Sequence, residues 1–213
     1  HTRSFHVTGV QTCALPILID AAVTLFAGHG VAATSTKAIA AEAGVTPALV
    51  HYYFRDRDTL LDAIFEERLR PLIEHVFGTL QAGPPDPVAR IQALAEQLIR
   101  TASATPWFPG LWIREIVGTE GQLRERLLQR VALQRAELIA TPLAAAHAQG
   151  RLNPGLEPAL VMVSLIGLTL LPLATTHIWR ALPGAADIDT DTLVRHVTAL
   201  LGHGLSVPPK TAA

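Results

Sequence analysis

The sequence predicts an all-α fold, in which a small domain of three helices is followed by a larger helical body. Apolar residues recur at the three- and four-residue spacing of amphipathic helices, and no segment alternates apolar and polar residues for long enough to indicate a sheet. Of the 213 residues, 49% are hydrophobic and 16% are charged. This composition supplies enough apolar side chain for a packed core and argues against extended disorder.

The first helix is expected from Ile17 to about Gly30, because Pro16 precedes it at a favoured position and glycines end it. One face of this helix is apolar and carries Leu18, Ala22, Leu25 and Phe26. Residues 1–16 fit neither the helical pattern nor a signal peptide. We expect them to form a leader that is either disordered or foreign to the native protein.

Two short helices are expected on either side of Gly44, which tolerates the positive φ of a sharp turn. Hydroxyl residues at 34–36 can cap the first, which runs to about Ala43. Thr46 can cap the second, with Pro47 at its favoured first position, and this helix runs to about residue 54.

The helical body is expected to begin with a long pattern that starts at Asp56 and kinks at Arg70–Pro71. A break at residues 82–85 then precedes Asp86, which can cap the next helix. Further helices are expected at roughly 109–117, 120–149, 155–180 and 187–205. The domains are therefore expected at 17–65 and 66–205, with a flexible tail at 206–213.

The segment from Pro158 to Trp179 has no charged residue and is long enough to span a bilayer. Against a membrane helix, Pro172 interrupts the run, hydroxyl residues and a glycine dilute it, and no basic cluster flanks one end alone. A helix that is apolar on every side is also expected when a partner subunit covers it. We expect no membrane association and a homodimer built on this helix and the one at 187–205.

The net charge of −1 excludes a protein that coats nucleic acid by charge alone, and residues 1–60 carry equal numbers of basic and acidic side chains. Any DNA binding must therefore be local. Cys13 is the single cysteine, which excludes an internal disulfide and is typical of a reducing, cytoplasmic setting. The histidines have no metal-binding spacing, so neither a metal site nor a cofactor is expected.

Residues 35–54 meet the steric requirements of a helix-turn-helix motif. Two short helices that cross steeply need a small residue at their contact, here Ala40, and a turn residue, here Gly44. Apolar anchors must also face a third helix, and these are Ile39, Ala43, Val45, Val50 and Tyr53. The alternative is an ordinary helical hairpin in a core, because the Ile-Ala-x-x-Ala pattern alone is common.

With these residues in place, positions 17–65 resemble the DNA-binding domain of the tetracycline-repressor (TetR) family. The resemblance rests on residues 18–22 with Leu25–Phe26, on 34–45, and on 50–54 through Arg57 and Leu60. Three features depart from the family pattern: His51 stands where Tyr is usual, Arg57 stands where Lys is usual, and basic residues before the first helix are missing. The resemblance implies a dimeric transcriptional regulator, most simply a repressor, that a small molecule releases from operator DNA.

If the third helix lies in the major groove of double-stranded DNA, its exposed residues reach the base edges. These are Thr46, Pro47, Ala48, His51 and Tyr52. Helix amino termini are expected to hold phosphates, which gives this role to Thr34, Ser35, Thr36, Lys37 and Arg57. Tyr53 is expected to divide its side chain between the core and a phosphate. Each of these residues could instead be an ordinary cap or a solvated side chain.

An effector pocket is expected in the body, where Pro106 and Pro109 interrupt an aromatic segment. Its expected lining is apolar and comprises Trp107, Phe108, Trp112, Met162, Ile166 and Thr169. The alternative, that these are ordinary core residues, stays open. Arg114 and Glu115 follow the aromatics and are expected to pair with each other.

Two other classes of function compete with a DNA-binding regulator. An enzyme is not indicated, because the sequence has no phosphate-binding glycine loop, no nucleophile elbow and no His-Glu-x-x-His, and we expect no catalytic residue. A helical adaptor or membrane-anchored protein without DNA binding is favoured only by the uncharged run at 158–179. The sequence identifies neither the operator nor the effector.

Overall fold

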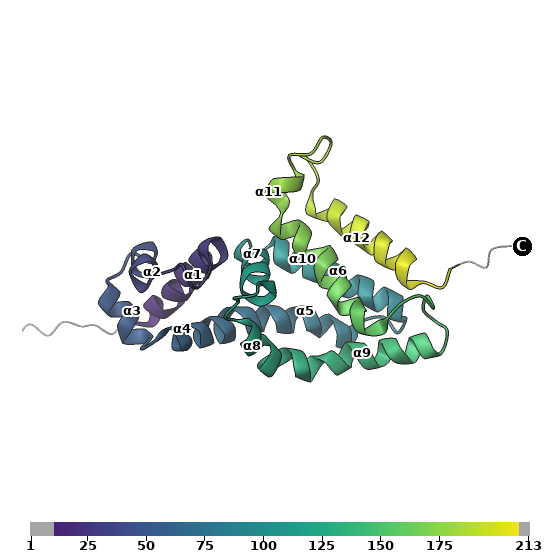
Figure 1. Ribbon diagram of the computed structural model, residues 1–213, viewed down its shortest axis with the longest axis horizontal. Helices are drawn as coiled ribbons and strands as arrows, with labels where there is room; N and C mark the ends of the chain where they lie inside the picture. The colour runs from purple at the N-terminus through teal and green to yellow at the C-terminus, as the bar shows by residue number, and fades with distance from the viewer. Residues whose placement is uncertain (1–10, 209–213) are drawn as a thin grey trace, which may run out of the picture.

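The computed structural model describes residues 11–208, and within that range every regular element is a helix (Figure 1). The predicted all-α class is therefore confirmed. A small group of helices lies at one end of the elongated molecule, and a larger helical body forms the rest (Figure 1). The first group comprises α1 (Gln11–His29), α2 (Thr36–Glu42), α3 (Pro47–Tyr53) and α4 (Arg57–Ile64).

The body continues from α4 without a loop. It comprises the π-helical segment η1 (Phe65–Leu69), α5 (Arg70–Ala82), α6 (Pro87–Ser103), α7 (Trp107–Leu111), the π-helical η2 (Trp112–Val117), α8 (Arg124–Leu127), the π-helical η3 (Leu128–Ala132), α9 (Leu133–Ala148), the 3₁₀ turn η4 (Pro158–Leu160), α10 (Val161–Ala174), α11 (Thr176–Trp179) and α12 (Thr190–Leu205).

Helix α1 begins at Gln11, which corrects the expected boundary of the leader at residue 16. Ala14 is buried in the core, and Leu15 packs against it, so this extra turn gains apolar contacts. From η1, Arg68 donates a hydrogen bond to the Asp20 carboxylate at 2.7 Å and a longer one to the Pro16 carbonyl at 3.4 Å. These contacts compensate for the main-chain hydrogen bond that is missing at Pro16, which lies inside α1 and has no N–H to donate. Residues 1–10 of the expected leader lie outside the described residues.

The first three helices and α4 share one apolar core. Leu18 and Phe26 of α1, Ile39 of α2, Val50 of α3 and Leu61 of α4 are each essentially inaccessible to solvent. Burial of side chains of this size contributes about 1.5–3 kcal/mol each relative to full exposure. The core therefore fixes the angle at which α2 and α3 leave α1.

Short polar side chains cap three of the predicted helix starts, whereas Thr46, which precedes α3, makes no side-chain cap hydrogen bond. The Ser35 hydroxyl accepts from the Ala38 N–H at 3.1 Å at the start of α2. Asp56 and Asp86 accept in the same way from Thr59 and Ala89, each at 2.8 Å, at α4 and α6. Each such cap stabilises its helix by about 1 kcal/mol. The boundaries of α2, α4 and α6 are therefore set locally.

The expected irregularity near Arg70–Pro71 takes the form of η1, which ends directly before Arg70. Proline has no N–H to donate back into the preceding turn, and a π-helical turn accommodates the mismatch without breaking the helix. The chain from Arg57 to Ala82 thus runs continuously from the small domain into the body (Figure 1).

In the body, α6 is central and packs against α5, α10 and α12. The helix expected at 155–180 is instead divided into η4, α10 and α11, because α10 ends at Ala174, two residues after Pro172. Thr175 donates to the Leu171 carbonyl at 2.7 Å at this end. Within residues 11–208, no helix combines the length and the apolar character that a membrane crossing requires.

Candidate functional site

The turn between α2 and α3 has the geometry of a helix-turn-helix. Gly44 has a φ of +66°, which a side chain at this position would strain. The Val45 N–H donates to the Ala40 carbonyl at 2.9 Å and closes the turn. Ala40 is buried at the crossing, and Val50 anchors α3 in the core. The small contact, the turn and the anchor are therefore where the sequence predicts them.

Helix α3 presents the predicted base-reading residues to solvent. Thr46, Pro47, Ala48 and His51 are exposed, and the Tyr52 side chain is 72% accessible. Tyr52 packs edge-on against the ring of Tyr53, with the ring centroids 5.4 Å apart. Tyr53 is half-buried against the core, in keeping with its expected divided role. A short helix that presents such a row of exposed side chains can be inserted into the major groove of DNA.

The amino terminus of α2 offers a second polar surface next to α3. Ser35 caps the helix and is exposed, Thr36 is half-buried, and Lys37 projects from the first turn into solvent. Main-chain N–H groups at a helix start, joined by a lysine, favour a phosphate. Arg55, which follows α3 and is also exposed, adds a cation that the site prediction omitted. Its position directly after the aromatic end of α3 is the sequence signal that could have identified it.

Thr34 and Arg57 both have hydrogen-bond partners within the protein, although Arg57 is also exposed to solvent. The Thr34 side chain is buried, and its hydroxyl donates to the Gly30 carbonyl at 2.8 Å, so the hydroxyl is used within the fold and the phosphate role of this position stays a prediction. The Arg57 guanidinium donates to the carbonyl oxygens of Val31 and Thr34 at 2.6 and 2.7 Å. Arg57 therefore fixes the α1–α2 loop, and its contact with DNA stays a prediction.

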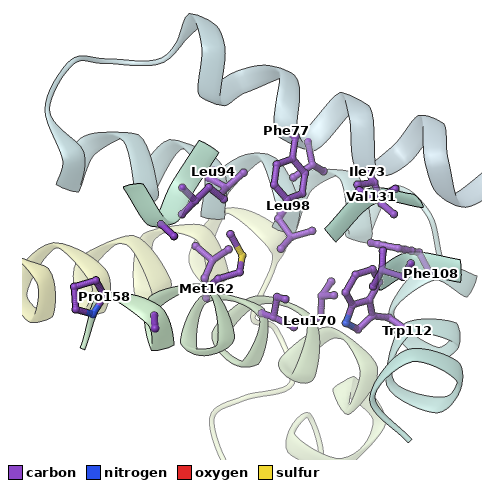
Figure 2. Close-up of a pocket in the computed structure, with 17 residues that line it drawn as sticks. Ile73, Phe77, Leu94, Leu98, Phe108, Trp112, Val131, Pro158, Met162 and Leu170 are labelled. Atoms are coloured by element: carbon purple, nitrogen blue, oxygen red, sulfur yellow. The ribbon is translucent and has the colours of Figure 1, made fainter. Parts of the chain in front are cut away.

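The body encloses a cavity of about 250 Å³ between α5, α6, the α7–η2 segment, η3 and α10 (Figure 2). Phe108 and Trp112 lie at one end and Pro158 at the other, with Met162 between them (Figure 2). Every lining residue is apolar: Ile73, Val76, Phe77, Leu94, Leu98, Phe108, Trp112, Leu127, Val131, Ile139, Ala140, Pro158, Ala159, Met162, Leu165, Ile166 and Leu170. The chemistry of this lining is hydrophobic contact alone.

Four of the six residues predicted for the pocket line this cavity: Phe108, Trp112, Met162 and Ile166. Trp107 does not, because it turns its ring edge-on to Phe108 and packs beside it. Thr169 is fully buried, and its hydroxyl donates to the Leu165 carbonyl at 2.7 Å within α10. Thr169 is therefore not among the residues that line this cavity.

The prediction missed the lining residues of α5 and α6, among them Ile73 and Leu98. Their amphipathic spacing indicates a buried face but does not say which helix covers it. A cavity arises where facing side chains fail to meet, and this depends on the packing of distant segments. The sequence carries no local signal for it.

The α7–η2 segment lies between the cavity and the small domain. Helix α7 packs against α1, and a Cβ at Gly110 would lie 3.3 Å from the Ala27 carbonyl oxygen. In η2, the buried Glu115 carboxylate accepts from the Val31 N–H at 2.8 Å and from the Gln122 N–H at 3.1 Å. Arg114 donates to the Gly28 carbonyl at 3.2 Å. The expected Arg114–Glu115 pair is therefore replaced by two separate links to the α1–α2 region.

A network of ion pairs joins α4 and η1 to α8 and η3. Asp62 lies 2.7 Å from both Arg126 and Arg130, and Glu66 lies 2.8 Å from Arg130. The hydrogen bond from Arg126 lowers the pKa of the Asp62 carboxyl, and the bond from Arg70 lowers that of Glu66. Both carboxylates are therefore ionised at neutral pH and attach α4 to the body.

Across residues 11–208, no three histidine, cysteine or acidic side chains lie close enough together to hold a metal ion. The described polar groups also provide no nucleophile beside a base near the cavity, whose lining is apolar throughout.

Comparisons with known proteins agree with this architecture. Residues 18–64 match the model of the bacterial regulatory proteins of the tetR family. Among curated proteins, the transcriptional regulator BetI of Rhizobium meliloti (strain 1021) is 30% identical over 105 residues, which cover 49% of this chain and 51% of that protein. BetI of Yersinia pestis (strain Pestoides F) is 36% identical over 89 residues, or 41% of this chain and 45% of that protein. The chain thus spans about half the length of the curated relatives it matches.

Solved structures extend the likeness to the whole fold. The ketosteroid transcriptional regulator KstR2 of Mycobacterium tuberculosis superposes with a TM-score of 0.71 at 17% identity, covering 91% of this chain and 95% of that one. AibR, solved with isovaleryl coenzyme A and operator DNA, gives 0.69 at 18% identity, covering 88% and 97%. A TetR/AcrR-family regulator of Thermobifida fusca is 25% identical, with a TM-score of 0.57 and coverage of 89% and 97%. Residues 18–64 therefore carry the pattern of the tetR-family DNA-binding region, and the described chain as a whole shares the fold of these solved structures.

Proposed function

We propose that this chain binds double-stranded operator DNA through α2 and α3 as a homodimer, and that a small apolar molecule in the cavity releases it. The observation that carries the proposal is the exposed surface of α3 at the end of the molecule opposite α12 (Figure 1). His51 and Tyr52 stand out from this surface while Val50 holds the helix in the core. The family match at residues 18–64 supports the same function.

The roles within the surface follow from chemistry. His51 and Tyr52 carry hydrogen-bonding groups that reach bases or phosphates, whereas Pro47 and Ala48 read thymine methyl groups or groove shape. Lys37 and Arg55 supply the phosphate contacts. Pairing of two such surfaces across a two-fold axis gives a half-site spacing of one helical turn or a multiple of it.

The homodimer is supported by apolar side chains that the isolated body leaves in solvent. They lie on η4, α10, α11 and the loop and helix that follow, and comprise Leu160, Val163, Leu171, Ile178, Leu182 and Leu200. Exposed apolar area of this kind is typical of a surface that a partner covers. Helices α10 and α12 both pack on α6, so a second copy placed against them would build a four-helix interface.

The effector is proposed to be uncharged and mainly hydrocarbon. A charged group would lose its hydration in this cavity without gaining a partner, because no lining side chain is polar. An apolar cavity of about 150 Å³ is large enough to hold benzene, so about 250 Å³ here has room for a larger ring system or a branched chain. The continuous helix from Arg57 to Ala82 gives one route to the DNA-binding end, because α5 lines the cavity and α4 carries the small domain.

DNA selected from a random duplex pool by the wild-type chain supplies the operator for the test. His51→Ala should weaken binding to that DNA by about 1–3 kcal/mol, measured by fluorescence anisotropy. His75→Ala, which removes an exposed histidine from α5, is the matched control and should bind as the wild type does. The proposal would be contradicted if the selection enriched no DNA sequence, or if both variants lost the same amount of affinity for the selected DNA.

A further inference from the structure

The α1–α2 loop is held by two side chains, one from η2 in the body and one from α4 in the small domain. Glu115 of η2 accepts from the Val31 N–H, and Arg57 of α4 donates to the Val31 carbonyl. Four residues after Val31, Ser35 caps α2 and begins the surface proposed for phosphate. The N–H and the carbonyl of Val31 are thus each bonded to a side chain from another helical element, shortly before the DNA-binding helices begin.

Glu115 is an unusual residue at this position because its side chain is buried, with only 4% of the residue accessible. A buried carboxylate needs hydrogen-bond donors to offset lost hydration, and both of its oxygens have one. The second donor, Gln122, lies in the loop after η2. This loop can approach η2 closely because Gly121 has no side chain, and a Cβ there would clash with the Glu115 carbonyl oxygen. The carboxylate is therefore held in one position from the body side.

The residue of η2 that lines the cavity lies in the same helical segment as Glu115. Trp112 lines the cavity and Glu115 follows it by three residues, so both belong to one turn of η2. Phe108 extends the aromatic end of the cavity into α7, which packs against α1 (Figure 2). A displacement of the two rings by a bound molecule has to move η2, because the packed interior has no slack to absorb it.

We propose that Glu115 is a coupling residue, which transmits occupancy of the cavity to the amino terminus of α2 through the Val31 N–H. The inference rests on the proposed function, since it assumes an effector in the cavity, and it adds a route that does not pass through α4. Gly30 is part of the device: its φ is +86°, and a Cβ there would lie 3.4 Å from Oε1 of Glu115 and 3.1 Å from Cδ of Arg114. A side chain at this position would strain the backbone and crowd Arg114, which lies beside the carboxylate.

The test uses the full chain, the selected DNA and the neutral fluorescent probe N-phenyl-1-naphthylamine. In Glu115→Gln one oxygen becomes an NH₂ group that cannot accept a hydrogen bond, while size is unchanged. The probe should lower the DNA affinity of the wild type by about tenfold and that of Glu115→Gln by about twofold or less. Glu120→Gln, an exposed change in the adjacent loop, should respond as the wild type does.

Hydrogen exchange at the Val31 amide gives a second measurement that does not depend on DNA binding. The probe should speed exchange at Val31 in the wild type, and Glu115→Gln should show the fast rate without the probe. A probe that lowers DNA affinity of the wild type and leaves Val31 exchange unchanged would overturn the coupling role alone, as would a full response of Glu115→Gln. A probe that fills the cavity without altering DNA affinity would instead contradict the proposed effector and, with it, the coupling.

Discussion

Arg57, the first residue of α4, donates from its guanidinium to the main-chain oxygen of Val31 at 2.6 Å. A second bond from the same group, to the Thr34 oxygen, spans the rest of the loop. Two parallel donors in a fixed plane are a property of arginine that lysine lacks. The loop between α1 and α2 therefore depends on a side chain that lies more than twenty residues further along the chain.

Arg57→Lys should lower the free energy of unfolding by about 1 kcal/mol, because one of two charge-assisted hydrogen bonds to the loop is lost. Urea denaturation followed by circular dichroism measures the change. Arg55→Ala is the control, since Arg55 is exposed two residues earlier, and this variant should weaken DNA binding at unchanged stability. Equal stability of the wild type and Arg57→Lys would show that the loop is held by other contacts.

Filling the cavity should remove probe binding. Val131 of η3 is buried and lines the cavity, so Val131→Phe places a ring in the space an effector would occupy. Leu128→Phe, on the same π-helical segment but 40% exposed, is the matched control. Titration with N-phenyl-1-naphthylamine should give at least about tenfold weaker binding for Val131→Phe, which is about 1.4 kcal/mol. Similar affinities in both variants would mean that the probe binds elsewhere.

The Asp62 contacts predict a defined pH dependence. The pKa of Asp62 lies below its ordinary value of 3.8, chiefly because Arg126 donates a hydrogen bond to it. When the pKa of a carboxyl group falls on folding, the group stabilises the folded state at pH values above its pKa in the unfolded chain. This contribution is lost as the pH falls through its pKa in the folded state. Asp62→Asn should therefore cost about 1 kcal/mol or less at pH 7, and the difference should shrink below pH 3.8.

Denaturation curves between pH 7 and pH 3 provide this comparison, with Asp187→Asn in the exposed α11–α12 loop as the control. A deficit of Asp62→Asn that is the same at every pH would show that the loss arises from packing and not from ionisation.

The apolar face of α10 and α12 predicts the oligomeric state. Leu200→Glu introduces a charge at an exposed apolar position on α12 and should yield a monomer of about half the mass of the wild-type species in sedimentation. Leu138→Glu, which is similarly exposed on α9, should leave the mass unchanged. A wild-type chain that sediments as a monomer at micromolar concentration would exclude the homodimer.

The weak local charge predicts a shallow dependence of DNA affinity on salt. Lys37→Ala removes one phosphate contact from each subunit, so the slope of log K against log salt should fall in magnitude by about two for a dimer. Affinity measured at several salt concentrations on selected and unrelated DNA checks this, because a phosphate contact affects both equally. An unchanged slope would leave Lys37 as a solvated side chain.

The sequence predicted the small domain closely because its signals are local. Gly44, Pro47 and the Ser35 cap each act within one turn of the chain, so their meaning does not depend on distant packing. The start of α1 was misplaced because Pro16 is typical of a helix start, and here the burial of Ala14 overrides that preference.

The cavity was half predicted for the opposite reason. The aromatic residues Phe108 and Trp112 can be recognised in the sequence as a cluster. Leu94 and Leu98 have the spacing of any buried helix face, and the sequence does not say which segments pack opposite them. The π-helical segments η1, η2 and η3 have no sequence signature, and Glu115 was assigned to Arg114 because neighbours in sequence are the simplest partners. One of its two donors, the Val31 N–H, is 84 residues away.

The cavity draws its walls from residues as far apart as Ile73 and Leu170, so it forms when the whole body is assembled. A molecule that fills it binds the folded chain and not the unfolded one, and stabilises the fold by about 2.7 kcal/mol at a hundred times its dissociation constant. The melting temperature of the chain therefore rises with occupancy. A thermal-shift screen of uncharged apolar compounds can then rank candidate inducers before any binding sequence on a chromosome is known.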